Sequence, residues 1–69
     1  MYKFRFKLLE VRKSKCMTQK RLAYLSNISQ SHISELETGK ESPTLKTVEN
    51  LAYALKTHPS DLLEVNKHK

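Results

Sequence analysis

The stretch TQKRLAYLSNISQSHISELETGKESPT, residues 18–44, decides the fold of this 69-residue chain. Thr18 and Ser29 are residue types whose hydroxyls cap the N-termini of helices. Between them, Asn27 tolerates the left-handed backbone with which a helix can end. Gly39 is expected to end the second segment, because glycine is the commonest residue just past a helix. The stretch therefore predicts two short helices joined by a tight turn.

The apolar residues of this stretch lie at helical spacing. Leu22 and Ala23 mark the inward face of the first of its two helices, and Ile33 and Leu36 mark that of the second. Two helices with so short a connection must cross at a steep angle, with Ala23 where their backbones approach. The spacing predicts a helix-turn-helix over about residues 18–37.

Three further helices are predicted around this unit. The first carries Phe4, Leu8 and Val11 on one face and should end near Lys15, with residues 1–7 forming a basic N-terminal segment. The fourth follows a break at Pro43, and its apolar stripe is the longest in the chain: Leu45, Val48, Leu51, Ala52 and Leu55.

The last part of the chain is expected to be short and loosely held. Pro59 at a first helical position predicts a short fifth helix that carries Leu62 and Leu63, and residues 66–69 are predicted to be a frayed tail. The expected fold class is all-α, with five helices in a single domain over residues 1–69.

Charge favours a polyanionic partner. The chain has thirteen Lys and Arg against seven Asp and Glu, a net charge of +6, and eight of the cations lie in the first 21 residues, opposed there only by Glu10. Such an excess suits nucleic acid. A solvated surface that only keeps the protein soluble remains an alternative reading, so charge supports DNA binding without establishing it.

Other classes of function lack the residues they need. The single cysteine, Cys16, cannot form an internal disulfide, and the N-terminus has no long apolar run, so we expect a cytoplasmic protein with no membrane segment. The histidines and Cys16 do not have metal-site spacing, and Gly39 is the only glycine, which excludes a glycine-rich phosphate loop. We therefore expect no enzyme, no metal or other cofactor, and no small-molecule substrate.

The outward face of the third helix carries the candidate chemistry. With Ile33 and Leu36 turned inward, this face presents Gln30, Ser31, Ser34 and Glu35, with His32 to one side. An α-helix fits the major groove of B-DNA, where glutamine can pair with adenine, serine can donate or accept, and glutamate can accept from cytosine N4. This face is predicted to read base edges.

The stretch over residues 18–44 resembles the Cro/repressor (XRE-like) helix-turn-helix proteins. The resemblance runs from about Leu8 to Leu63. The positions that carry it are Arg12, Thr18-Gln19, Leu22-Ala23, Ile28-Ser29, Ile33-Ser34, Glu37, Gly39, Pro43, Leu51-Ala52 and Leu55. It implies a five-helix, lambda-repressor-like fold and a transcriptional regulator that binds double-stranded DNA. It also implies a two-fold homodimer on a palindromic operator, with the third helix in the major groove.

The resemblance also implies roles for individual residues. Gln30, Ser31 and Glu35 would read bases, with His32 beside them. Gln19 would bind a phosphate and brace Gln30, and the other candidates for phosphate contact are Thr18, Ser29 and Lys40. Arg12 would pair with Glu37 in a structural ion pair. The chain departs from the family pattern at Asn27, often glycine, at Thr57, usually a small aliphatic, and at Glu41, commonly a cation or amide.

Two questions stay open at this stage. Repression needs only occupancy of an operator, whereas activation needs a surface for polymerase, so we favour a repressor. The rival from another class is an antitoxin-like or adaptor module whose main partner is a protein. Tyr24, Leu25 and Tyr53 fall outside the predicted inward faces, and dimerisation through the fourth and fifth helices is a hypothesis.

Overall fold

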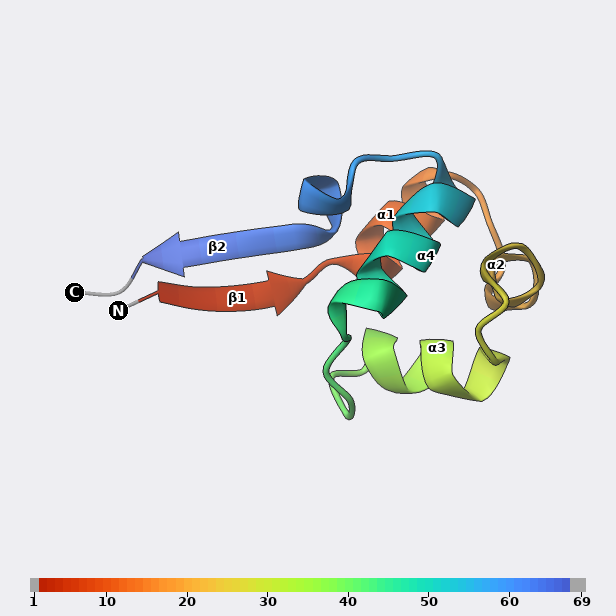
Figure 1. The fold of residues 1–69 in the computed structure, drawn as a ribbon, viewed down its shortest axis with the longest axis horizontal. Helices are drawn as coiled ribbons and strands as arrows, with labels where there is room; N and C mark the ends of the chain where they lie inside the picture. The colour runs from red at the N-terminus through yellow and green to blue at the C-terminus, as the bar shows by residue number, and fades with distance from the viewer. Residues whose placement is uncertain (1, 68–69) are drawn as a thin grey trace.

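The structure, a computed structural model, describes the backbone of residues 2–67 and the side chains of residues 4–65. It contains four α-helices, a single 3-10 turn and two strands. In chain order these are β1 (Tyr2–Phe6), α1 (Leu8–Ser14), α2 (Gln19–Ser26), α3 (Gln30–Glu37), α4 (Leu45–Leu55), η1 (Pro59–Leu62) and β2 (Leu63–Lys67). The strands pair with each other and project from one end of the helical body (Figure 1).

The predicted helix-turn-helix is confirmed as α2 and α3. The Thr18 hydroxyl accepts a hydrogen bond from the backbone N–H of Arg21 at 3.0 Å, and the Ser29 hydroxyl accepts one from the N–H of His32 at 3.1 Å. Asn27 ends α2 with φ 59°, in the left-handed region, and Gly39 follows α3 with φ 81°. The capping and turn residues thus act as their chemistry predicts.

The core is built around α4, which supplies half of the buried apolar residues. Leu22, Ile33 and Leu36 are buried as predicted. The complete buried set is Leu8, Leu22, Ile33, Leu36, Val48, Leu51, Ala52, Ala54, Leu55 and Leu62. Leu45 was expected in the apolar stripe of α4, but it is 83% exposed because it is the first residue of that helix and extends beyond the part that the other helices cover.

The first predicted helix begins too early. Residues 2–6 form β1, and α1 begins only at Leu8. Phe4 is therefore not on an inward helical face, and its side chain is mostly exposed. In KFRF, aromatic and basic residues alternate with a period of two, which suits a strand as soon as a partner strand is available. That partner lies at the other end of the chain.

The predicted fifth helix and tail are also corrected. Pro59 does begin a helical turn, but η1 is one 3-10 turn that ends at Leu62. Leu63 starts β2, and Asn66 and Lys67, expected in a frayed tail, pair in β2, while residues 68–69 lie outside the described residues. The fold is mostly helical, with four α-helices and a small sheet, in place of five helices and loose ends.

The two strands are antiparallel and give the sheet two different faces. Phe4 lies opposite Val65, Arg5 opposite Glu64, and Phe6 opposite Leu63. Opposite residues share a face, and faces alternate along a strand. Over residues 4–6 and 63–65, one face, called here the apolar sheet face, therefore consists of Phe4, Phe6, Leu63 and Val65.

The other face of the sheet is charged and internally paired. Arg5 forms ion pairs with Glu64, at 3.3 Å between Nε and Oε1, and with Glu10 at the start of α1. The pKa of Glu10 lies below its ordinary value, because its carboxylate accepts a hydrogen bond from its own backbone N–H and another from Arg5.

Within residues 2–67, every helix is too short or too polar to cross a bilayer.

Candidate nucleic-acid interface

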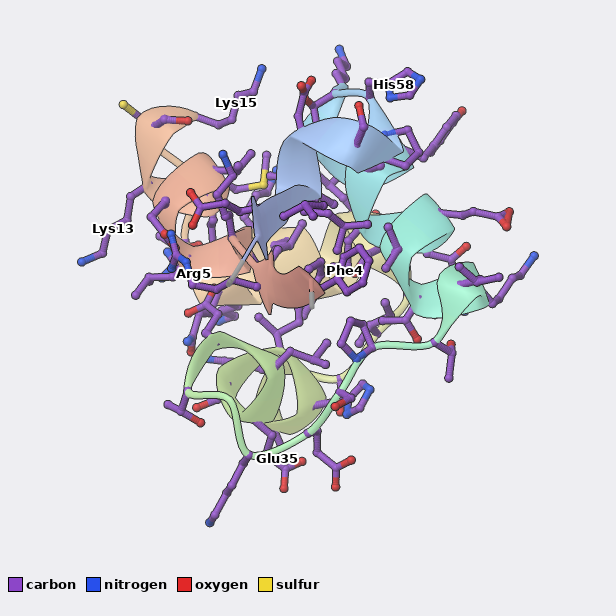
Figure 2. All side chains as sticks on the ribbon, turned by 90° about the vertical axis from the view of Figure 1, so that its left-hand side faces the viewer. Phe4, Arg5, Lys13, Lys15, Glu35 and His58 are labelled. Carbon is purple, nitrogen blue, oxygen red and sulfur yellow. The ribbon has the colours of Figure 1, made fainter. Side chains whose placement is uncertain are left out.

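The exposed face of α3 gathers the predicted base readers in one place. Gln30, Ser31 and Glu35, together with Ser34 and with Gln19 from the start of α2, line a surface hollow of about 480 Å³. Figure 2 shows Glu35 at the opposite end of the molecule from His58, pointing away from the protein. A partner that lies along α3 therefore meets these polar groups first.

His32 stands apart from the other candidate readers. It is half-buried and does not line the hollow. Ser34 is half-buried as well, but it lines the hollow with Gln30, one helical turn earlier. The geometry thus places Ser34 among the candidate readers more directly than His32.

The two helix caps adjoin the reading face. Thr18 precedes α2 and Ser29 precedes α3, and each hydroxyl oxygen accepts a backbone N–H of its helix. A hydroxyl that accepts in this way still has its own hydrogen to donate. Helix N-termini also attract anions through their free N–H groups and their dipole. Both caps are therefore chemically suited to a phosphate, as the resemblance implies.

An ion pair ties α1 to the end of α3. Arg12 Nε donates to Glu37 Oε2 at 2.5 Å, and Arg12 Nη2 donates to Oε1 at 3.1 Å. Arg12 Nη1 also donates to the Met17 carbonyl at 2.7 Å. The Arg12 and Glu37 side chains are only 12% and 4% exposed, so the pair is shielded from water and joins the elements that carry the reading face.

Gln19 belongs to the same cluster. Its Nε2 donates to Glu37 Oε1 at 2.8 Å, so in this structure its amide N–H group is held by Glu37 and not by Gln30. The brace between Gln19 and Gln30 that the resemblance implies is not formed here. Gln19 still lines the hollow with Gln30, and its Nε2 has a second hydrogen to donate.

The loop after α3 extends the interface toward Lys40. Thr38, Gly39 and Lys40 line a second hollow with Ser34 and Glu35, which are shared with the first. The backbone N–H of Lys40 donates to the Glu35 carbonyl at 2.9 Å, which holds the loop against the end of the helix. Lys40 is exposed there, where a phosphate beside α3 would lie.

Thr38 is a lining residue that the sequence did not single out. Its hydroxyl donates to the Ser34 carbonyl at 3.1 Å. Its position could have been found from spacing, because Gln30, Ser34 and Thr38 recur at four-residue intervals on one helical face. Thr38 follows the last residue of α3, where sequence patterns locate a helix boundary least well.

The cations of the first 21 residues do not form one patch beside α3. Lys13 and Lys15 project from the region of α1, away from Glu35 (Figure 2). Lys20 and Arg21 lie on α2 and are exposed, and Arg21 stacks over the ring of Tyr24 at 5.8 Å. Arg21 also lines a hollow with Lys15 and Tyr53, whereas Lys40 lines the hollow at the end of α3 and supplies charge to a partner there.

The described residues 2–67 contain no group of three or more His, Cys, Asp and Glu that could hold a metal ion. Cys16 is exposed and forms no disulfide. The chemistry on the α3 face is that of hydrogen-bond donors and acceptors, which suits recognition of a polar surface.

The similarity of this chain to known proteins covers its helices. The family model described as helix-turn-helix matches residues 8–62. The control protein C.BamHI of Bacillus amyloliquefaciens is 34% identical over 59 residues, which are 84% of this chain and 73% of that protein. The matched residues 8–62 contain α1 to α4 and η1, and they leave out β1 and β2.

Solved structures with a similar fold include further proteins of this kind. The restriction-modification controller protein C.AhdI from Aeromonas hydrophila gives a TM-score of 0.78 at 34% identity, over 81% of this chain and 85% of that chain. The clp gene regulator ClgR from C. glutamicum gives 0.78 at 28% identity, over 81% and 73%. A protein from Bacteroides fragilis, at 24% identity, gives a TM-score of 0.82 over 90% of this chain and the whole of that chain, and shares the fold.

Proposed function

The chain belongs to the helix-turn-helix family and is a DNA-binding transcriptional regulator, and from that premise we propose that it is a repressor that occupies a palindromic operator as a homodimer. In this proposal α3 lies in the major groove. The observation that carries the proposal is the hollow on α3, which Gln30, Ser31 and Glu35 line together; Gln30 and Ser31 are exposed and Glu35 is half-buried.

The proposed roles follow from the side chains. Gln30 and Ser31 read base edges at the start of α3, and Glu35 accepts from a cytosine amino group one turn later. Gln19 and Lys40 contact phosphates on either side of the reading face, with the hydroxyls of Thr18 and Ser29 beside the helix starts. Arg12 and Glu37 hold this arrangement together and touch no DNA.

The length of α3 argues for two copies. A helix of eight residues is about 12 Å long and reaches only a few base pairs. Operators recognised by helix-turn-helix proteins are read by dimers that place two such helices about one turn of DNA apart. Occupancy of such a site is sufficient for repression, and no further surface is required.

The test is binding of the purified protein to DNA from its own promoter region and to random duplex, across a salt series. We expect binding to the promoter that is at least about a thousandfold tighter, with a steep dependence on salt. Weak and equal binding to both DNAs would contradict the proposal and would favour an antitoxin-like or adaptor role with a protein partner.

Two variants separate reading from phosphate contact. Gln30→Ala should weaken binding to the promoter by about 1–3 kcal/mol and relax the preference at one base position. Lys40→Ala should weaken binding to both DNAs about equally and reduce the salt slope by about one. Lys13→Ala is the matched control, because Lys13 projects away from Glu35 and should leave binding nearly unchanged (Figure 2). Equal losses on both DNAs for Gln30→Ala would refute its role as a reader.

A further inference from the structure

The apolar sheet face has no partner in the described fold. Phe4 is 72% exposed, Val65 52% and Leu63 36%, and only Phe6 packs against the core. A groove of about 530 Å³ adjoins this face, between the sheet and the loop after α3. Its apolar lining is Phe4, Phe6, Leu36, Pro43 and Leu63.

This two-stranded sheet lacks part of the packing that a sheet needs to be stable in water. A two-stranded sheet is at best marginally stable in water unless its apolar face packs on a further strand or helix. Here Phe6, of the inner pair, packs against the core, whereas the outer pair, Phe4 and Val65, extends beyond it. The outer half of the sheet therefore lacks the packing that would stabilise it.

The chemistry of the sheet selects the kind of partner. On the charged face, Arg5 is already neutralised by Glu10 and Glu64. The four side chains that make up the apolar sheet face are uncharged, so a polyanion such as DNA forms no ion pair with them. A partner must present an apolar surface of the same shape and size, and a second copy of this chain presents one.

We propose that the apolar sheet face packs against the same face of a second copy, so that β1 and β2 of both chains form the dimer interface. The proposal deepens the proposed function and rests on it, because it identifies the surface through which the homodimer on the operator forms. It replaces the hypothesis that the fourth and fifth predicted helices, now α4 and η1, mediate dimerisation.

The direction of the face is compatible with a two-fold dimer on DNA. In Figure 2, Glu35 points down, whereas Phe4 and Arg5 point to opposite sides of the sheet, Phe4 toward the side of α4 and Arg5 toward the side of α1. The apolar sheet face is thus turned sideways from the reading face. A two-fold axis parallel to the direction of Glu35 brings two such faces together and leaves both α3 helices facing the same DNA.

The length of the sheet sets a distance between the two helical bodies that is close to the distance between recognition helices on B-DNA. The sheet lies along the longest dimension of the molecule, 40 Å, at one end of the helical body (Figure 1). Two overlapping sheets of five-residue strands, each about 17 Å long, separate the helical bodies by roughly 35–40 Å between centres. The recognition helices of a dimer on B-DNA lie about 34 Å apart.

The position of the sheet in the chain gives independent support. β1 and β2 lie outside residues 8–62, which the family model matches, so the sheet is not part of the matched helical unit. The apolar sheet face adjoins Leu36, near the end of α3, and Pro43 in the loop that follows. A second copy that packs on this face therefore lies near the end of the reading helix.

The area of the face predicts a weak dimer. A stable interface buries about 800 Å² per partner, and three partly exposed apolar side chains supply only a few hundred Å². Dimerisation should therefore depend on protein concentration in the micromolar range or above and be strengthened by DNA, which binds both copies at once.

The experiment compares Phe4→Ser and Val65→Thr with Tyr53→Ser in the whole chain. Tyr53 is a large, exposed aromatic on α4, at 84% exposure, and lies on the rival surface. Sedimentation equilibrium over a concentration series gives the dimer dissociation constant. We expect each sheet variant to raise it at least about tenfold, because every substitution counts twice in a two-fold dimer, and Tyr53→Ser to leave it unchanged.

Three results would overturn the proposal. The wild-type chain could stay monomeric at high concentration, both free and on a full operator. The sheet variants could dimerise as strongly as the wild type, or Tyr53→Ser alone could dissociate the dimer. Circular dichroism at dilute concentration, where the chain is a monomer, checks that each variant is folded. Phe4 is exposed, so its replacement should leave helical content intact.

Binding to DNA separates this proposal from the proposed function. The sheet variants should keep their affinity for a single half-site and lose the gain that the wild type shows on the full palindrome. A wild-type chain that dimerises through the sheet but binds no DNA specifically would refute the proposed function and leave the interface in place. Specific DNA binding by the wild type with no effect of Phe4→Ser on the full site would refute the interface alone.

Discussion

Ser26, at the end of α2, is the buried polar residue of the core. Its side-chain oxygen has no hydrogen-bond partner among the described residues, and the residue is 5% exposed. A hydroxyl that leaves water without gaining a partner costs free energy on folding. The end of α2 therefore carries a small, local destabilisation.

We expect Ser26→Ala to stabilise the fold by about 1 kcal/mol, because it removes the uncompensated hydroxyl and introduces a better helix former. Urea unfolding, followed by circular dichroism, measures the change. Ser14→Ala is the matched control, since the Ser14 hydroxyl is exposed and donates to the Val11 carbonyl at 2.7 Å. A loss of stability in Ser26→Ala would show that this hydroxyl has a partner in solution.

Glu37 shows what could and could not be predicted at the scale of single residues. The pair of Arg12 and Glu37 was expected from the family resemblance, and the structure contains it. The hydrogen bond from Gln19 to Glu37 was not expected. Gln19 begins a helix and is polar, so its sequence position is compatible with a phosphate contact, with a contact to Gln30 and with this one. Only the packing of α2 against α3 decides among them.

The 3-10 turn η1 is stabilised by hydrogen bonds to a side chain near its start. Thr57 Oγ1 donates to Asp61 Oδ2 at 2.8 Å, and the backbone N–H of His58 donates to the same oxygen at 3.3 Å. The hydrogen bond from Thr57 is the main reason that the pKa of Asp61 lies below its ordinary value, with the His58 N–H adding to it. Thr57, a departure from the family pattern, thus has a definite role in this turn.

Thr57→Val should raise the pKa of Asp61 toward its ordinary value, as observed by NMR titration of the carboxyl group. A carboxylate whose pKa is lowered by folding stabilises the fold above its unfolded pKa, near 4, and loses that contribution as the pH falls through its folded pKa. The wild type should therefore be more stable than Thr57→Val at pH 7, by a margin that shrinks in acid. Thr57→Ser keeps the hydroxyl and should titrate like the wild type; an unchanged pKa in Thr57→Val would contradict the assignment.

The helices could be predicted from the sequence and the strands could not, for a physical reason. Caps and apolar spacing are local signals, and they located α2, α3 and α4. A strand is stabilised by its partner, and β1 and β2 are about sixty residues apart, so neither is marked by its neighbours in sequence. Phe4 fits the spacing of a helical face with Leu8 and Val11, which explains why the sequence predicts it on the first helix.

At the scale of the whole molecule, stability should be uneven. α4 supplies half of the buried apolar residues, whereas the outer half of the sheet reaches beyond the core. Segments with few buried contacts open locally at a lower free energy than global unfolding. The body and the sheet are therefore expected to differ in protection even though they form one fold.

Hydrogen exchange at dilute protein concentration tests this expectation. The amides that pair β1 with β2 should exchange faster than those in the middle of α4, because opening the outer sheet leaves the core intact. Exchange of both segments at one common rate would show that the sheet opens only when the whole chain unfolds. The amides of α3 serve as an internal reference, since Ile33 and Leu36 anchor that helix in the core.

The antiparallel pairing of β1 with β2 also has a consequence for synthesis of the protein on the ribosome. The ribosome makes β1 before the helical domain and β2 after it, so a nascent chain that has already produced α3 still lacks half of the sheet. Such a chain can fold a recognition helix, but it has no complete surface with which to meet a second copy. Under the proposed mode of assembly, two copies can therefore associate only as finished domains, and the order of translation separates folding of the DNA-reading unit from its dimerisation.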